Sequence, residues 1–255
     1  MMLLMDIGNT RVKWARLQDG QLLVGAPALH RGQPLASVWA ELWSGLPRPQ
    51  HVLVACVAGD EYRANLAAWC HARWGLQPEF VFATAESCGV RNGYRQPSQL
   101  GVDRWLALIG AYQLRETSGQ PLCVVGCGTA LTVDILAADG HHLGGWIAPG
   151  LVLMCEQLRQ GTAVVAAAMD LAVSPEDFGH GTAEALAVGV RQAAVGLVMQ
   201  ALHLAQRLLG RSTVCVVSGG DTGMLLPLLP AGAVEVPDLV LRGLATQVRR
   251  QGTRQ

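Results

Sequence analysis

Charged residues are scarce in this sequence, at 15% of 255 positions, and the two signs cancel to a net charge of zero. So neutral a chain lacks the basic surface with which proteins bind nucleic acid in general. The short basic end that begins at Arg249 is expected to be a solvated terminus. Hydrophobic residues make up 51%, which excludes disorder and provides buried cores for one large domain or two ordinary ones.

Paired cysteine motifs are also missing. The seven cysteines form no C-x-x-C pair, their number is odd, and several lie within apolar runs. This pattern excludes a disulfide framework and a zinc site, and it is typical of a reduced, cytoplasmic protein. The histidines show no metal-ligand spacing, and His141-His142 is expected to be solvated.

Segments that direct a chain to a membrane are the third absence. No basic region precedes the short apolar run at Met1, so we expect no signal peptide. No apolar stretch reaches the roughly 18 residues that a membrane span needs. We therefore expect neither a membrane nor a nucleic acid among the partners.

The first seventeen residues carry the pattern around which the chain is organised. Met1 to Met5 predicts a buried strand, Val12 to Leu17 predicts a second, and Asp19-Gly20 is typical of a hairpin turn. In the turn Gly8-Asn9-Thr10, a phosphate can approach the glycine closely and accept hydrogen bonds from N–H groups and the threonine hydroxyl. Asp6 can hold Mg²⁺ through water. An ordinary hairpin with a solvated aspartate is the alternative.

The same unit recurs 120 positions later. An apolar run from Leu122, the turn Gly126 to Thr129, a second run from Ala130 and the turn Asp139-Gly140 follow in the same order. Five identities fall at this single offset, which indicates an internal duplication. The identical pairs are Gly8/Gly128, Asp19/Asp139, Gly20/Gly140, Leu23/Leu143 and Gly25/Gly145.

Two such hairpins, one in each half, resemble the phosphate-binding hairpins of the actin/hexokinase/Hsp70 superfamily. The resemblance implies an α/β chain with a duplicated ribonuclease H-like (actin-like ATPase) fold. Each half would contain a mixed β-sheet flanked by helices. We expect residues 1–117 to form the first half, and residues 118–255 the second.

Alternating strands and helices are predicted along the rest of the chain. The predicted strands are Gln50–Val57, Phe80–Phe82 and Thr213–Val217, and the predicted helices are Ala64–Trp74, Trp105–Leu114, Leu151–Arg159 and Ala183–Leu209. Thr182 is expected to cap the last of these helices. Ser87 to Arg104 is expected to be a loop and Gly144 to Gly150 a glycine-rich connection, while the type of Ala163 to Val173 is ambiguous.

A second chemical cluster lies between Tyr94 and Arg104. Asp103 can accept a proton from a substrate hydroxyl, and the guanidinium of Arg104 can bind a carboxylate or phosphate through two parallel hydrogen bonds. Alternatively, Asp103 caps a helix that begins at Trp105 and pairs with Arg104 on the surface.

Together these motifs resemble type III pantothenate kinase, also called the Bvg accessory factor family. The opening Asp6-Ile7-Gly8-Asn9-Thr10 matches Asp-x-Gly-Asn-[Ser/Thr]. The segment from Tyr94 to Arg104 matches Tyr-x-x-Pro-x-x-Leu-Gly-x-Asp-Arg at every specified position. Gly144 to Gly150, Thr182 and Gly219-Gly220-Asp221 follow in the family's order, so the resemblance spans nearly the whole chain.

The resemblance implies ATP-dependent phosphorylation of pantothenate, the first step of coenzyme A synthesis, by a homodimer whose pantothenate pocket is completed across the subunit interface. It implies ATP binding with Mg²⁺ at Asp6, Ile7, Gly8, Asn9, Thr10, Arg11, Val12, Lys13 and Thr129. It implies pantothenate binding at Tyr94, Gly101, Val102, Asp103, Arg104 and Thr182, with Asp103 as the general base. The helix from Ala183 is the candidate dimer element.

One position departs from the family. Gly126 stands where the resemblance implies an aspartate that coordinates a monovalent cation, usually potassium. A glycine has no carboxylate, so we assign no residue of this chain as a metal ligand. Two alternatives stay open: a kinase or phosphatase for another small hydroxy acid, and a regulatory protein without catalysis.

Overall fold

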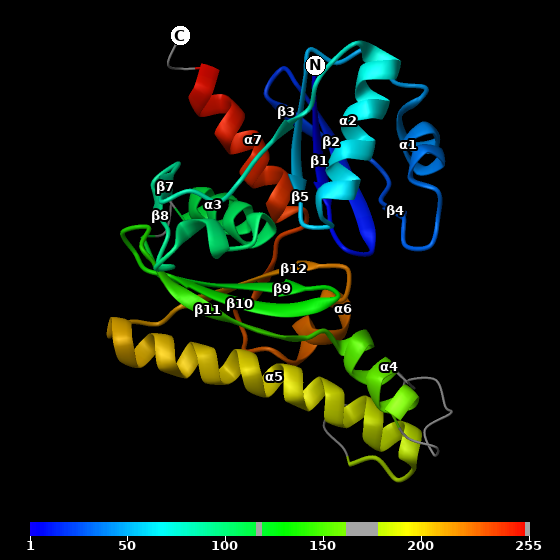
Figure 1. The fold of residues 1–255 in the computed structure, drawn as a ribbon. Helices are drawn as coiled ribbons and strands as arrows, with labels where there is room; N and C mark the ends of the chain where they lie inside the picture. Colours follow the sequence, from blue (N-terminus) through cyan, green and yellow to red (C-terminus); the bar gives the residue numbers. More distant parts are fainter. Residues whose placement is uncertain (116–118, 162–177, 253–255) are drawn as a thin grey trace. The chain divides into compact units, whose positions relative to one another are not determined.

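The structure is a computed structural model that describes residues 1–115, 119–161 and 178–252. The chain divides into two compact units (Figure 1). The first comprises Met1–Leu114 together with the chain from Asp238 onward, and the second comprises Arg115–Pro237. The expected division after residue 117 had assigned the last helix to the second half, whereas that helix belongs to the first unit.

A six-stranded mixed sheet forms the centre of the first unit. Its order is β3-β2-β1-β5-β6, and the short β4 also pairs with β2. The strands are β1 (Met2–Ile7), β2 (Arg11–Gln18), β3 (Gln21–Val24), β4 (Ala28–Leu29), β5 (His51–Cys56) and β6 (Glu79–Phe80). β1 is antiparallel to β2 and parallel to β5. Leu3 and Leu4 point to opposite faces and both are fully buried, because β1 is apolar from Met2 to Met5 and the sheet is covered on both sides.

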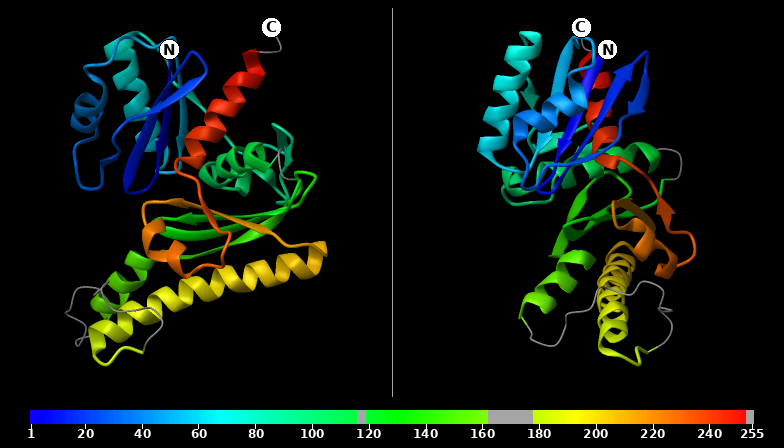
Figure 2. Two further views of the ribbon diagram at one scale, coloured as in Figure 1. Left: turned by 180° about the vertical axis from the view of Figure 1, so that it is seen from behind. Right: turned by 90° about the vertical axis from the view of Figure 1, so that its right-hand side faces the viewer.

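Helices cover both faces of this sheet (Figure 2). The helices of the first unit are α1 (Leu35–Trp43), α2 (Asp60–Trp74), α3 (Val102–Arg115) and α7 (Leu239–Gly252). The unit also contains the 3₁₀ turn η1 (Pro97–Gln99) and a two-stranded ribbon of β7 (Glu86–Ser87) and β8 (Val90–Arg91). On one face Met5 packs in a cluster with Trp39 of α1 and Leu66 of α2. On the other face α7 contacts β1, β2 and β5. The last helix thus completes the core of the first unit.

Two glycines allow α3 and α7 to cross closely. A Cβ atom on Gly110 would lie 2.5 Å from the Leu239 carbonyl oxygen, and one on Gly243 would overlap the Leu106 carbonyl. The backbones therefore approach more closely than any larger residue would permit.

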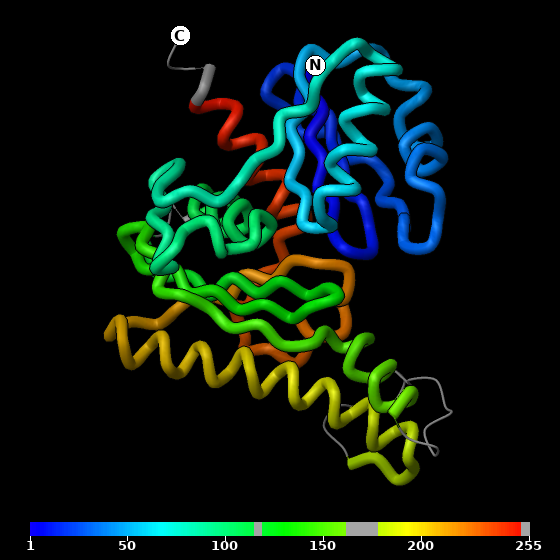
Figure 3. The backbone as a smooth tube through the Cα atoms, viewed as in Figure 1, coloured from blue at the N-terminus to red at the C-terminus, as the bar shows by residue number. Residues whose placement is uncertain are grey.

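The second unit repeats the sheet of the first. Its order is β11-β10-β9-β12-β13, with β9–β10 and β10–β11 antiparallel and β9–β12 and β12–β13 parallel. Its elements are β9 (Leu122–Cys127), β10 (Ala130–Leu136), β11 (His142–Pro149), α4 (Leu151–Gly161), α5 (Thr182–Leu209), β12 (Val214–Gly219), α6 (Thr222–Leu225), η2 (Leu226–Leu228) and β13 (Val234–Glu235). The long α5 runs along one face of the sheet (Figure 3) and packs Ala194 and Val198 against β9 and β10.

The matching strand orders confirm the predicted duplication, but the two turns predicted to bind phosphate differ in length. Three residues separate β1 from β2, and two, Gly128 and Thr129, separate β9 from β10. β1 and β9 therefore correspond at a sequence offset of 120, whereas the starts of β2 and β10 correspond at an offset of 119. The longer turn between β10 and β11 restores the offset at Asp139.

Some elements differ from the sequence prediction. α1 was missed, although Leu35, Val38, Trp39 and Leu42 have helical spacing. The glycine-rich connection from Gly144 is part of β11, because its backbone pairs with β10. The ambiguous segment Ala163 to Val173 lies outside the described residues.

The starts of three helices also differ from the prediction. α2 begins at Asp60, four residues before the predicted start at Ala64. α3 begins at Val102, three residues before the predicted start. Thr182 was expected to cap α5, which is wrong: Gly181 is the N-cap, and Thr182 is the first helical residue. Glu184 accepts the His180 N–H at 2.8 Å, and this bond ties the preceding chain to the helix. Gly75 and Gly210 are the C-caps of α2 and α5, each with a φ of 64°.

The expectation that no stretch is long and apolar enough to cross a membrane is wrong for α5. This helix has 28 residues, and a window within it has a mean hydropathy of 1.5. One such helix is weak evidence for a span, because core helices of folded domains pass the same test. α5 also buries Arg191, whose Nε donates to the Ala187 carbonyl oxygen at 3.1 Å.

Candidate active site

The turn after β1 presents small residues on a tightly bonded backbone. The Gly8 N–H donates to the Arg11 carbonyl oxygen at 3.1 Å, and a Cβ on this glycine would lie 3.4 Å from the same oxygen. Asn9 is exposed and Thr10 is half-buried. The side chains of Ile7 and Val12 are fully buried in the sheet core, so only their backbone groups can contact a ligand.

A cluster of charged groups surrounds the end of β1. Asp6 is half-buried, and the pKa of its carboxyl is raised to about 7, chiefly because burial disfavours the charged form. The carboxylates of Asp103 and Asp238 contribute to this rise, while the ammonium of Lys13 opposes it. Lys13 Nζ lies 3.8 Å from Asp238 Oδ1. Three carboxylates thus act on one another in the presence of one ammonium, which leaves the site with an excess of negative charge.

Asp238 is a member of this cluster that the sequence did not reveal. It stands directly before α7, and its carbonyl oxygen accepts the Arg242 N–H at 3.0 Å. Its φ of 58° lies in the left-handed region, which aspartate tolerates better than most residues. No pattern in the sequence connects it to residue 13, because 225 positions separate them; the pairing depends on α7 packing against the first sheet.

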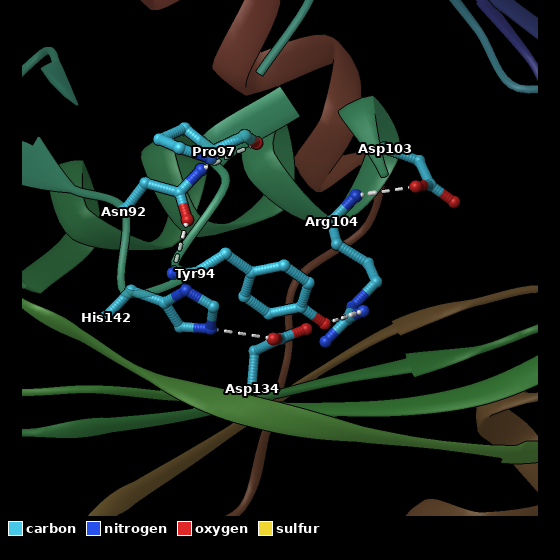
Figure 4. A network of polar contacts seen from close by, with 7 residues as sticks. All are labelled: Asn92, Tyr94, Pro97, Asp103, Arg104, Asp134 and His142. Carbon is cyan, nitrogen blue, oxygen red and sulfur yellow. Dashed lines mark hydrogen bonds and ion pairs between the residues drawn. The ribbon is translucent and has the colours of Figure 1, made fainter. Parts of the chain in front are cut away.

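The segment before α3 is held by side-chain hydrogen bonds (Figure 4). Asn92 Nδ2 donates to the carbonyl oxygens of Thr84 and Pro97, at 3.2 and 3.1 Å, and its Oδ1 accepts the Tyr94 N–H at 3.0 Å. Arg104 Nη1 donates to Tyr94 Oη at 2.9 Å, with the guanidinium carbon 5.6 Å from the ring centroid. Tyr94 and Arg104, both expected to bind the substrate, are therefore preorganised, and Asn92 is a further supporting residue that the sequence did not indicate.

Asp103 lies in the first turn of α3. Its Oδ1 accepts the Arg104 N–H at 2.8 Å, so it satisfies one of the exposed donors of the helix start. Arg104 is only 6% exposed and bonds to Tyr94, which contradicts the alternative of a surface pair. A Cβ on Gly101 would lie 2.7 Å from Asp103 Oδ1, so any larger residue at position 101 would displace this carboxylate.

The remaining predicted site residues belong to the second unit. Thr129 is exposed in the two-residue turn after β9, and its carbonyl oxygen accepts the Gly150 N–H at 2.9 Å. Thr182 is exposed at the start of α5. The turn after β12 lies against the end of β9: the Asp221 N–H donates to the Cys127 carbonyl oxygen at 3.2 Å, and Gly219 has a φ of 134°.

Gly126 occupies the strand position in β9 that Asp6 occupies in β1, next to the last residue of each strand. Its φ lies outside the left-handed region, so the backbone does not require glycine. A Cβ atom there would lie 2.5 Å from Thr132 Oγ1 on the neighbouring strand. The two halves thus carry a carboxylate at only one of the two equivalent positions.

The expectation of a solvated His141-His142 pair is wrong for His142. Its ring is fully buried, and its Nε2 lies 2.9 Å from Asp134 Oδ1 (Figure 4). His142 is the first residue of β11 and is buried, whereas His141 precedes the strand and is exposed.

Within the described ranges, no group of three or more histidine, cysteine, aspartate or glutamate side chains could hold a metal ion by itself. The donors at the first turn fit Mg²⁺ that arrives with a nucleotide, because Mg²⁺ keeps several waters and needs only one or two carboxylates. The excess negative charge at Asp6 favours such a cation.

Comparisons with known proteins agree with this geometry. Residues 2–203 match the family described as type III pantothenate kinase. The type III pantothenate kinase of Nitrosococcus oceani is 38% identical over 261 residues, which cover 98% of this chain and 97% of that protein. The one from Thiobacillus denitrificans is 40% identical over 256 residues and covers 98% and 97%.

Two solved structures resemble the fold. A protein described as a Baf family transcriptional activator from Campylobacter jejuni has a TM-score of 0.62 at 20% identity, covering 98% of this chain and 99% of that one. The activator of 2-hydroxyisocaproyl-CoA dehydratase from Clostridium difficile, with bound ADPNP, has a TM-score of 0.54 at 13% identity, covering 100% and 97%. These likenesses concern the fold alone, and they confirm the predicted fold class.

Proposed function

The chain belongs to the type III pantothenate kinase family, and on that premise we propose that it phosphorylates pantothenate with ATP. The products are 4′-phosphopantothenate and ADP, and the reaction begins coenzyme A biosynthesis. The observation that carries the proposal is the segment from Tyr94 to Arg104. It has every specified residue of the family's substrate motif and holds them in a hydrogen-bonded arrangement.

In this reaction the primary hydroxyl of pantothenate attacks the terminal phosphorus of ATP. A new O–P bond forms, the bond to the bridging oxygen breaks, and ADP leaves. The carboxylate of Asp103 accepts the hydroxyl proton. It can occupy its position because Gly101 has no side chain to displace it. Arg104 suits the substrate's carboxylate because a guanidinium offers five donors in a planar fork. Tyr94 orients that fork.

We assign the ATP phosphates to the Gly8-Asn9-Thr10 turn and Lys13, and a role for Thr129 stays a prediction from the family resemblance. Backbone N–H groups and hydroxyls of such turns donate to phosphate oxygens, and the ammonium adds positive charge. Mg²⁺ bound with the nucleotide would be held by Asp6 through water and would neutralise charge on the phosphates. The cluster of Asp6, Asp103 and Asp238 supports binding of the Mg²⁺ complex over the free nucleotide.

The cofactor proposal also concerns a monovalent cation. The family's cation ligand corresponds to Gly126, which offers no carboxylate. We therefore propose that this enzyme depends on potassium less than its relatives do.

We also propose a homodimer formed through the second unit. Apolar side chains of α4 and α5 line an open groove of about 420 Å³, among them Met154, Leu158 and Leu186. Leu158 in this lining is 48% exposed, and Ile147 of β11 is 64% exposed. A second copy of the same surface would cover them.

The seven free, buried cysteines support a reducing location, the cytoplasm.

Product analysis tests the function directly. The purified protein is incubated with ATP, Mg²⁺ and pantothenate, ADP is followed in a coupled assay, and the product is identified by mass spectrometry. We expect one 4′-phosphopantothenate for each ADP. ADP release without this product would contradict the proposal. Phosphorylation of a different hydroxy acid in a parallel series would favour the alternative substrate class, and no turnover would favour a regulatory protein.

A further inference from the structure

The residue His30 holds the carbonyl side of the first phosphate turn. Its Nε2 lies 2.8 Å from the Gly8 carbonyl oxygen, and its backbone N–H donates to the Thr10 carbonyl oxygen at 3.1 Å. A carbonyl oxygen only accepts hydrogen bonds, so Nε2 carries the hydrogen and donates it. One residue, directly after β4, thus holds both ends of the turn.

These two bonds determine where the N–H groups of the turn point. A trans peptide group is planar, and its C=O and N–H bonds point in opposite directions. A fixed Gly8 carbonyl therefore fixes the N–H of Asn9, and a fixed Thr10 carbonyl fixes the N–H of Arg11. Both belong to the segment assigned to the ATP phosphates.

The imidazole is itself fixed in position. It is 1% exposed, and it packs edge-on against the ring of Tyr62 on α2, with centroids 5.0 Å apart and an interplanar angle of 66°. Its Nδ1 is buried and has no hydrogen-bond partner among the described residues. A hydrogen on Nδ1 would be buried without an acceptor, whereas a hydrogen on Nε2 reaches the Gly8 carbonyl. The surroundings therefore select the Nε2–H tautomer.

We propose that His30 is a positioning residue of the phosphate turn, and that its Nε2–H donor orients the Asn9 and Arg11 N–H groups toward the triphosphate of ATP. The proposal rests on the proposed function for the identity of the nucleotide. It does not depend on the acceptor, because the turn is held in the same way whichever hydroxyl is phosphorylated. If His30 only filled space, its aromatic ring would matter and its Nε2–H donor would not.

Two substitutions separate these roles. His30→Phe keeps an aromatic ring against Tyr62 and loses the donor, while His30→Gln loses the ring and keeps an N–H group at the same reach. Calorimetry measures the Kd for Mg²⁺-ATP without pantothenate, and steady-state kinetics give the KM for each substrate. We expect His30→Phe to raise the Kd and KM for ATP about tenfold or more, with the KM for pantothenate unchanged. His30→Gln should recover most of the loss.

Three results would overturn the proposal: native ATP affinity in His30→Phe, equal losses in both variants, or equal losses for both substrates. Imidazole ¹⁵N chemical shifts of the unmodified protein provide a test that does not depend on a variant's folding. A hydrogen found on Nδ1 would contradict the proposal. If the unmodified protein binds Mg²⁺-ATP but does not phosphorylate pantothenate, the proposed function fails and the ATP affinities still decide the role of His30.

Discussion

At the scale of single residues, the proposed reaction depends on a carboxylate that a helix start and a neighbouring glycine keep in place. Asp103 accepts the Arg104 N–H, and Gly101 leaves room for its Oδ1. Asp103→Asn preserves shape and removes the proton acceptor. We expect kcat to fall by roughly 10²–10⁴-fold, while the Kd for ATP stays near its native value. Near-native kcat, measured in the coupled assay, would show that the side chain serves only the helix start.

The raised pKa of Asp6 predicts a pH-dependent stability. The folded protein holds this proton up to about pH 7, and the unfolded chain loses it near pH 3.8, the ordinary pKa of an aspartate. Between these values the folded state binds more protons, so the free energy of unfolding contributed by Asp6 falls as pH rises. The Asp6→Asn variant has no carboxyl group at this position, so its free energy of unfolding lacks this pH dependence. We expect the variant to gain stability relative to the unmodified protein between pH 5 and pH 8 in urea titrations without nucleotide; a difference independent of pH would contradict the assignment.

The position of Gly126 predicts a gain of potassium response. Gly126→Asp restores a carboxylate at the place equivalent to Asp6, and its φ permits the change. Because the new Cβ would lie 2.5 Å from Thr132 Oγ1, the double variant with Thr132→Ala removes the obstruction. Activity is measured against potassium at constant ionic strength, with Thr132→Ala alone as the control. A strong potassium requirement in the unmodified protein would show that other groups form the cation site.

At the scale of elements, the crossing of α3 and α7 connects the end of the chain to the first unit. The cluster at Asp6 depends on this crossing, because Asp238 stands at the start of α7. The backbones meet at Gly110 and Gly243, where no side chain fits.

Gly243→Ala is therefore expected to lower the free energy of unfolding by about 1–3 kcal/mol, since the new methyl group would overlap the Leu106 carbonyl. Gly223→Ala is the matched control, because a Cβ there would meet no atom within 4 Å. Urea denaturation of both variants measures the difference. Equal stability of the two variants would show that the helices can separate without cost.

At the scale of the whole molecule, the apolar groove of the second unit predicts a dimer of twice 27.0 kDa. Ala193→Arg introduces a charge into the lining at an exposed position, and Gln200→Arg makes the same change on α5 outside it. We expect light scattering to find a dimer for the unmodified protein and Gln200→Arg, and a shift toward monomer for Ala193→Arg. An active monomer of unmodified protein would contradict both the dimer and the shared pocket.

Local patterns were sufficient to predict the duplicated sheets, the two phosphate turns and the segment from Tyr94 to Arg104. Strands, turns and capped helices depend on neighbouring residues, and a motif of eleven positions is itself a local pattern. The same reasoning left open a surface pair of Asp103 and Arg104, which are adjacent in sequence, whereas Arg104 is buried and bonds to Tyr94.

Only the tertiary structure identified Asp238, His30, Asn92 and the buried pair of His142 with Asp134. Each has its role through a partner that the chain path, not the local sequence, brings near: α7 returns to the first sheet, and β4 lies beside the first turn. The sequence by itself determined which chemistry the chain carries, since the reactive groups stand in short motifs. The fold decided which groups orient them, because hydrogen bonds and ion pairs depend on distance in space and not on separation along the chain.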